Sequence, residues 1–219
     1  MGTESMGLRE SKKQETRQLI SDHATRLFIE QGFEQTTIAE IATAARVAKK
    51  TVTNYFPRKE DLALDHHEEF TATLARAVAG RAAGESPLAA LRREFAAAVE
   101  RCDPVAGFAG PEFARMAAES PTLTTRLREL HDRREEALAA ALAESAPADS
   151  PAIAPRAAAA LLGATHRLLF RRIQELTLAG EPNDRIAATV APEAAYAFDL
   201  LEAGFAAHLA ADLEVDTEA

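Results

Sequence analysis

The chain has 219 residues, 47% of them hydrophobic, a single cysteine and a formal net charge of −9 at pH 7. The apolar content excludes a largely disordered chain, and the lone Cys102 excludes an internal disulfide framework, which fits a reducing compartment. No apolar run approaches the roughly 18 residues that span a bilayer, and residues 1–13 lack the hydrophobic core of an export signal, so we expect a cytoplasmic protein without a membrane segment.

The whole chain is predicted to be all-α, because alanine is frequent, glycine and aromatic residues are sparse and no alternating β-branched run occurs.

A long helix over residues 11–31 is the first predicted element. Residues 1–10 are expected to form a polar arm, and Gly32 to cap the helix. Near the helix start, Lys12, Lys13 and Arg17 either reach a phosphate backbone or form a solvated face. The apolar face consists of Leu19, Ile20, Ala24, Leu27 and Phe28.

Two short helices joined by a tight turn are predicted over residues 37–56. Thr37 and Glu40 form a capping-box pattern at the start of the first helix. The second helix buries Val52 and Phe56, carries cations and hydrogen-bonding groups but no carboxylate on its other faces, and ends before a proline. So short a helix is not stable alone. Its polar face is therefore available to a partner, as in a helix-turn-helix that enters the major groove of DNA.

This stretch resembles the DNA-binding segment of the TetR family of bacterial repressors. Arg46 stands where the family usually has the turn glycine, and a residue with a side chain is disfavoured at positive φ. The resemblance implies a three-helix DNA-binding domain over residues 1–57 and a larger helical domain for effector binding and dimerisation over residues 58–219. The residues that carry the resemblance are Ile38, Ile41, Ala42, Ala45, Val47, Thr51, Val52, Tyr55, Phe56, Lys59, Glu60 and Leu62.

The negative charge of the chain does not extend over this segment. Up to Asp65 ten cations balance ten acids, and every lysine lies at or before Lys59. Phosphate binding depends on local cations rather than on total charge, so the segment is suited to DNA. The residues predicted to meet base edges or nearby phosphates are Lys49, Lys50, Thr51, Thr53 and Asn54. Those predicted to grip phosphate and set the register are Thr37, Tyr55 and Lys59.

The remaining predicted elements are helical. One long helix over residues 58–83 is expected to link the two domains, followed by a helical stripe over residues 88–99 and an irregular stretch over residues 103–116. The next helix begins at Pro121 and carries leucines through Leu142. Residues 147–155 are a predicted linker. Two long helices over residues 156–178 and 192–211, separated by a short helical turn at residues 185–190, precede an acidic tail.

The last two long helices carry broad apolar faces. Small residues let helices approach closely, which suits a four-helix interface with a second copy of the chain, and the resemblance implies the same homodimer. The alternative is that both faces pack into the chain's own core, which periodicity alone does not distinguish. The faces consist of Ala159, Leu162, Leu169, Phe170 and Ile173 on the first helix and Ala195, Phe198, Leu201, Phe205 and Leu209 on the second.

The resemblance also implies a small, largely apolar effector held among the helices of the second domain. Each candidate residue is alternatively a plain core residue. His131 and His166 are the most informative, because an imidazole on an apolar face needs a hydrogen-bond partner. The candidate ligand-binding residues are Phe70, Leu74, Phe95, Phe108, Phe113, Met116, Leu127, His131, His166 and Phe170.

No catalytic, metal-binding or cofactor-binding site is predicted. His66 and His67 lack a second ligand four residues away on the same face. Cys102 lacks a nearby histidine or glycine loop, so it is expected to be a buried or half-buried thiol rather than a nucleophile. The charged run over residues 133–136 is expected to be a solvated helix face.

These features predict a ligand-responsive, homodimeric transcriptional repressor. It would bind a palindromic double-stranded DNA operator and be released by the effector. One alternative is a DNA-binding regulator without a small-molecule effector. The other is a helical enzyme or lipid carrier in which the DNA-binding segment is vestigial.

Overall fold

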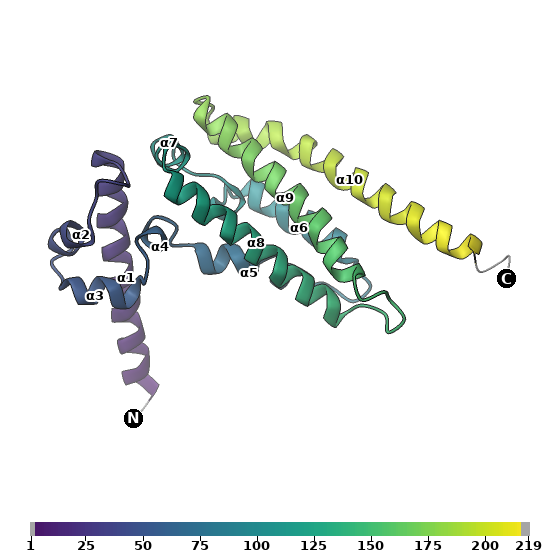
Figure 1. Ribbon diagram of the computed structural model, residues 1–219, viewed down its shortest axis with the longest axis horizontal. Coiled ribbons are helices and arrows are strands. Elements are labelled where there is room, and N and C mark those ends of the chain that lie inside the picture. The colour runs from purple at the N-terminus through teal and green to yellow at the C-terminus, as the bar shows by residue number, and fades with distance from the viewer. Residues whose placement is uncertain (1–2, 216–219) are drawn as a thin grey trace. The chain divides into compact units, whose positions relative to one another are not determined.

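The computed structural model describes the backbone of residues 3–215 and the side chains of residues 11–205. Within that range the chain is helical and has no strand, which confirms the all-α prediction (Figure 1). The elements in order are α1 (Thr3–Gln31), α2 (Ile38–Ala44), α3 (Lys49–Tyr55), α4 (Lys59–Ala63), α5 (His67–Ala79), α6 (Pro87–Glu100), the 3-10 turn η1 (Pro104–Ala106), α7 (Pro111–Glu119), α8 (Pro121–Glu144), α9 (Ala154–Leu178) and α10 (Asn183–Val215).

The chain divides into two compact units that do not follow the expected boundary after residue 57. The first unit consists of residues 1–67 and 112–128, and the second of residues 68–111 and 129–219. The first unit therefore includes α4, α7 and the beginning of α8 in addition to the three expected helices. The second unit contains α5, α6, η1, the rest of α8, α9 and α10.

The first unit has its own hydrophobic core. Helix α2 packs on α1 and on α3, and α4 also packs on α1 (Figure 1). Met116 of α7 and Leu123 of α8 belong to this core, although in sequence both come after α5 and α6 of the second unit. The core also contains Ile20, Ala24, Phe28, Phe33, Ile41, Ala42, Ala45, Val52, Phe56, Leu62 and Ala63. The predicted burial of Val52 and Phe56 is confirmed.

A buried ion pair ties α4 to α8 inside the first unit. Arg126 donates from Nε and from a terminal nitrogen to Oδ1 of Asp61, at 3.2 and 2.8 Å. Both side chains are buried, at 6% and 7% exposure. The start of α8 is thus fixed to the first unit by a charged contact as well as by apolar packing.

The predicted single helix over residues 58–83 is wrong. The structure has α4 and α5, separated by residues 64–66, with Leu64 at φ −110 and ψ 54. Asp65 is held at this break from α1, because Ser21 donates to its carboxylate at 2.5 Å and Arg17 donates to its carbonyl oxygen at 3.4 Å. These contacts join residues 44 and 48 positions apart, so helical periodicity could not indicate them.

Three further boundaries differ from the prediction. Helix α1 begins at Thr3, so the expected arm is helical from that residue, and residues 1–2 lie outside the described range. Helix α7 occupies part of the predicted irregular stretch, where Pro111 suits the first turn of a helix. Helix α10 is one helix with Pro192 inside it rather than two. Burial of Ile186, Val190 and Ala194 along one face offsets the backbone hydrogen bond that proline cannot donate.

The core of the second unit takes up most of the apolar faces that were considered for a dimer. Ala159, Leu162, Leu169, Phe170 and Ile173 of α9 are all buried in the chain itself, as is Phe198 of α10. Leu209 lies outside the described side chains. The alternative, that these residues belong to the chain's own core, is therefore correct for the six buried residues. Leu201 and Phe205 are partly buried against the same core, and Ala195 is partly exposed.

Candidate DNA-binding surface and ligand cavity

The helix-turn-helix begins with the predicted capping box. The Thr37 hydroxyl accepts the backbone N–H of Glu40 at 3.3 Å, and the Glu40 carboxylate accepts the backbone N–H of Thr37 at 2.8 Å. The Thr37 hydroxyl and backbone N–H both lower the pKa of the Glu40 carboxyl. This reciprocal pair satisfies two otherwise free N–H groups and fixes where α2 starts.

The turn between α2 and α3 places Arg46 in a left-handed conformation. Its φ is 54, one of two positive φ values among described residues other than glycine. The next residue, Val47, donates its backbone N–H to the Ala42 carbonyl at 2.9 Å, which closes the end of α2. A side chain in this conformation costs about 1–2 kcal/mol. The turn thus has the geometry that glycine would adopt without strain.

Replacing Arg46 with glycine is expected to raise the free energy of unfolding by about 1 kcal/mol, because the strain at φ 54 disappears. Denaturant unfolding measures the change. The reverse substitution, Gly32→Ala at φ 88, is the matched control and is expected to lower stability. A less stable Arg46→Gly variant would show that the Arg46 side chain stabilises the turn by more than its conformation costs.

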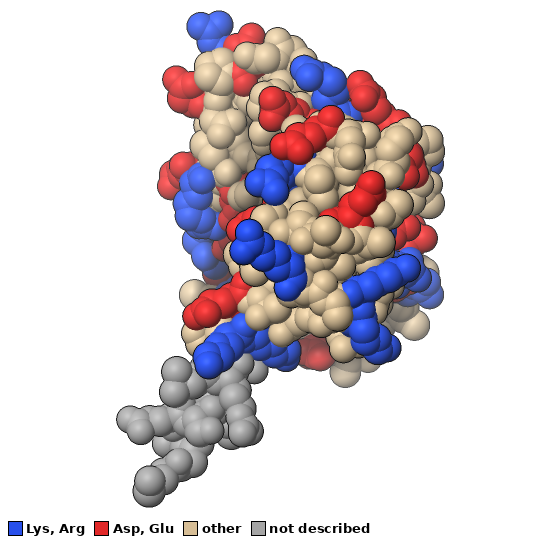
Figure 2. Space-filling model, turned by 90° about the vertical axis from the view of Figure 1, so that its left-hand side faces the viewer, with Lys and Arg blue, Asp and Glu red and all other residues tan. Residues whose placement is uncertain are grey.

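Helix α3 presents a polar, acid-free surface. Lys49, Lys50 and Asn54 are exposed, while Thr51, Thr53 and Tyr55 are partly exposed. Val52 is the buried residue of the helix. Figure 2 shows the face of the molecule that carries α2 and α3, where lysine and arginine side chains gather on the lower half. The predicted base-reading residues therefore lie together on one accessible helix.

Two cations are occupied inside the first unit: Arg17, for which a phosphate contact or a solvated face was considered, and Lys59, which was predicted to bind phosphate. Arg17 donates to the Tyr55 carbonyl at 3.2 Å, and its guanidinium carbon lies 4.4 Å from the Phe56 ring centroid. Lys59 donates to the carbonyl oxygens of Phe33, Glu34 and Thr36, at 2.9, 3.4 and 3.2 Å. Since an ammonium group has three N–H donors, we do not propose a phosphate contact for Lys59.

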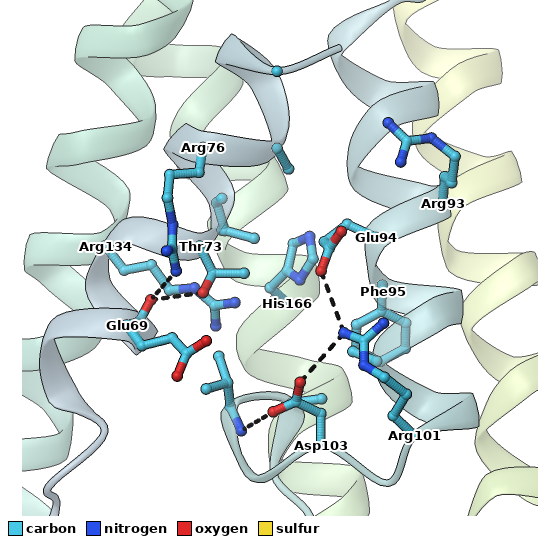
Figure 3. A pocket seen from close by; sticks show the side chains of 16 residues that line it. Glu69, Thr73, Arg76, Arg93, Glu94, Phe95, Arg101, Asp103, Arg134 and His166 are labelled. Carbon is cyan, nitrogen blue, oxygen red and sulfur yellow. Dashed lines mark hydrogen bonds and ion pairs between the residues drawn. The ribbon is translucent and has the colours of Figure 1, made fainter. Parts of the chain in front are cut away.

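The second unit contains a cavity of about 370 Å³. Helices α5 and α6 and the turn η1 form its walls, and Arg134 of α8 and His166 of α9 reach it from behind (Figure 3). Its volume falls within the range of small-molecule sites. Arg76, Arg93 and Arg101 line it and are exposed, so the cavity opens to solvent.

Two polar atoms buried beside this cavity have no hydrogen-bond partner. They are Nε of Arg134 and Nε2 of His166. The exposed fractions of these two residues are only 6% and 4%. Burial lowers the pKa of the Arg134 guanidinium to about 10. Burial, followed by the positive charge of Arg134, lowers the pKa of His166, which is therefore neutral at pH 7. Unpartnered buried polar groups are rare in native proteins.

Aromatic rings surround these two groups. Phe70 contacts both His131 and Phe170 edge-on, at centroid distances of 5.0 and 5.8 Å. The Arg134 guanidinium carbon lies 4.5 Å from the Phe70 centroid. His166 lies edge-on to Phe95 and Phe198, both at 5.6 Å.

The predicted ligand-binding residues separate into three groups. Leu74, Phe95 and His166 line the cavity. Phe70, His131 and Phe170 form the aromatic cluster that contacts Arg134, and Phe108 is a core residue of the same unit. Phe113, Met116 and Leu127 lie in segments of the first unit, so they are not part of this cavity. Two parts of the lining were not predicted from the sequence: Arg134, which was assigned to a solvated face, and the residues of η1.

Acid should destabilise the protein through His131. Burial, followed by the charges of Arg134, Arg167 and Arg171, lowers its pKa from 6.5 to about 3. Below pH 6.5 the unfolded chain binds a proton that the folded protein does not, so stability falls as pH decreases towards 3. Between pH 7 and pH 5 this residue alone is expected to cost about 2 kcal/mol. His131→Gln should show a correspondingly smaller loss between two denaturant titrations at these pH values; equal losses would contradict the expectation.

No metal site is found among the residues with described side chains, where no three His, Cys, Asp or Glu side chains form a suitable group. His67 lies 2.9 Å from the Leu64 carbonyl through Nδ1, and His66 lies 3.7 Å from the Asp65 carboxylate. Cys102 is half-buried. No helix in the described part of the chain combines the length and the apolar character needed to cross a membrane.

Comparison with known sequences matches the helix-turn-helix region to a family. Residues 20–65 match the model for bacterial regulatory proteins of the tetR family. The HTH-type transcriptional regulator TcmR of Streptomyces glaucescens is 37% identical over 95 residues, which are 43% of this chain and 42% of TcmR. The match thus spans less than half of that relative.

Solved structures share the fold over most of the chain. NalD of Pseudomonas aeruginosa, the secondary repressor of the MexAB-OprM multidrug efflux pump, has a TM-score of 0.54 at 19% identity, over 84% of this chain and 96% of NalD. SmeT in complex with triclosan has a TM-score of 0.52 at 20% identity, over 83% and 90% of the two chains. Residues 20–65, which form the helix-turn-helix, are thus similar to the DNA-binding segment of the tetR family, and the fold of the chain is similar to that of NalD and SmeT.

Proposed function

We propose that the protein is a cytoplasmic, dimeric transcriptional repressor that binds a palindromic operator and is released by a small ligand. The observation that carries the proposal is α3. Its exposed side chains include two lysines and an asparagine but no carboxylate, while Val52 fixes its opposite face in the core. A surface of this kind suits the major groove, where phosphates and base edges supply acceptors.

Lys49, Lys50, Thr51, Thr53 and Asn54 would meet base edges or nearby phosphates. Thr37 and Tyr55 would contact phosphate and set the register. Contacts to phosphate provide affinity, and contacts to base edges provide sequence preference. Two such helices about one turn of DNA apart would read a near-palindrome.

The dimer would form through α9 and α10, but through faces different from those first considered. On α9 the exposed residues Leu161 and Leu168 lie on a stripe that also contains Ala157 and Ala164. On α10 Tyr196 and Leu200 are 71% and 64% exposed. Apolar stripes of this kind on adjacent helices match a self-complementary four-helix interface. We therefore assign these stripes to a second copy of the chain.

The ligand would occupy the cavity of the second unit. That cavity favours a ligand-responsive regulator over one without a small-molecule effector. The solved SmeT complex contains triclosan, a small molecule, in a protein of the same fold. We propose no catalytic role.

Helix α8 offers a physical route between ligand and DNA. Arg126, which pairs with Asp61, and Arg134, which lines the cavity, lie eight positions apart on this one helix. A ligand that binds better to one arrangement of α8 would shift the population of the DNA-binding state. Ligand and DNA would then weaken each other's binding by the same factor.

Selection of bound sequences from a random pool of duplex DNA tests the proposal. The expected result is enrichment of one inverted repeat, bound by two chains, at low ionic strength. Failure to enrich any sequence, together with failure to retain DNA at low salt, would contradict it. That result would favour the alternative function of a helical enzyme or lipid carrier.

A further inference from the structure

The cavity in the second unit contains a buried cation, Arg134, for which no ion pair is found among the described residues, although Glu69, Glu94 and Asp103 also line the cavity. Arg134 is 6% exposed and lines the cavity, and its Nε has no hydrogen-bond partner. Its contact with the Phe70 ring is the one favourable interaction of its charge found among the described residues. Burying an ion without a counter-ion costs more than a cation–π contact returns.

Each of the other three arginines that line the cavity has a partner, and Arg76 donates to the Glu69 carbonyl at 3.4 Å. Arg101 lies 3.6 Å from Glu94 and 3.3 Å from Asp103. Arg93 donates to the Glu85 carboxylate at 2.9 and 3.1 Å. Arg134 therefore differs from them in being both buried and unbalanced.

His166 provides a second unpartnered group in the same cavity. Its Nε2 is buried without a partner, and the neutral ring is held edge-on between Phe95 and Phe198. In Figure 3 His166 and Arg134 both reach the space between α5 on one side and α6 on the other. A buried guanidinium and an imidazole that converge on one space, with aromatic rings around them, match an acidic group attached to an apolar skeleton.

We propose that the ligand of this protein is a small amphipathic organic anion whose acidic group binds Arg134 and His166. The inference rests on the proposed ligand-responsive function, because it names the chemical class of the ligand. The anion would supply the charge that Arg134 lacks, and the imidazole would donate a second hydrogen bond. The apolar part would lie against Leu74, Phe95 and Ala98, which line the same cavity. A cavity of about 370 Å³ holds roughly a dozen water molecules, so the ligand has on the order of a dozen or more non-hydrogen atoms.

Thermal unfolding with matched probes, in the absence of DNA, tests the inference. The probes are 2-naphthoate, 2-naphthyl phosphate and the neutral 2-naphthamide. The first two distinguish a carboxylate from a phosphate, and the amide keeps the shape without the charge. At about 100 times its Kd an anion is expected to raise Tm by roughly 5–10 °C. The amide should bind at least tenfold more weakly, since hydrogen bonds between charged groups are the stronger ones.

Arg134→Met separates a ligand contact from a structural role. Without ligand its Tm should equal or exceed that of the wild type, because an unbalanced buried charge is replaced by an apolar side chain of similar length. Its preference for the acids over the amide should disappear. Arg133→Met, the adjacent exposed arginine outside the cavity lining, is the control and should keep that preference.

Three outcomes would overturn the inference. They are equal stabilisation of the wild type by acids and amide, no stabilisation by either acid, and a marked fall in Tm for unliganded Arg134→Met. The last would show that the charge is already balanced within the fold. Because the assay contains no DNA, its failure leaves the DNA-binding proposal intact, and failure to bind DNA leaves this result interpretable.

Discussion

Replacement of Asp61 by asparagine is expected to lower the free energy of unfolding of the first unit by about 3–5 kcal/mol. The change keeps the shape of the side chain but removes the negative charge of the buried carboxylate to which Arg126 donates at 3.2 and 2.8 Å. Denaturant unfolding followed by circular dichroism measures the loss. Removing the counter-ion of a buried charge is among the most destabilising single changes.

The matched control is the exposed pair of Arg92 and Asp199. Its atoms are also close, at 2.6 Å, but the two side chains are 40% and 61% exposed. Asp199→Asn should therefore cost no more than about 1 kcal/mol. The double variant Asp61→Leu with Arg126→Met should recover most of the lost stability, because no buried charge remains. An Asp61→Asn variant as stable as Asp199→Asn would contradict the role given to the buried pair.

Replacement of Lys49 and Lys50 by alanine is expected to weaken operator binding by roughly 100- to 1,000-fold, since a dimer loses four cations from its DNA-facing helices. The plot of log affinity against log salt should flatten by up to about 0.9 for each phosphate that the variant no longer neutralises. Both lysines are exposed and alanine favours helix, so the folded state should persist. Fluorescence anisotropy over a range of salt concentrations measures both effects.

A control with the same change in charge isolates the position of the cations. Arg115 and Arg133 are exposed and lie on α7 and α8. Their double replacement by alanine should leave the salt dependence close to that of the wild type. If both double variants lose affinity equally, total charge rather than α3 would govern binding.

The features predicted correctly from the sequence are those determined by neighbouring residues. The capping box of Thr37 and Glu40, the burial of Val52 and the ends of α2 and α3 depend on local hydrogen bonds and helical spacing. The unusual residue at the turn, Arg46, also marked the position of positive φ.

The features that were missed depend on contacts between distant residues. The break between α4 and α5 is held by Ser21 and Arg17, and Lys59 is held by carbonyls that follow α1. The burial of Arg134 could have been found, because it continues the spacing of Leu127 and Leu130 and precedes Leu138 by four residues. Because the residues next to Arg134 in the sequence are charged, the whole run was assigned to a solvated face instead.

Site-directed DNA cleavage tests directly whether α3 lies in the major groove, on which the proposed function depends most. In a Cys102→Ser background, which removes the single cysteine, Asn54→Cys would carry an iron-EDTA cleavage reagent. The expected result is two clusters of strand cleavage in the operator, centred about one helical turn apart. Glu136→Cys, exposed on α8 in the second unit, is the control. Cleavage from position 54 that is no more localised than cleavage from position 136 would contradict the account.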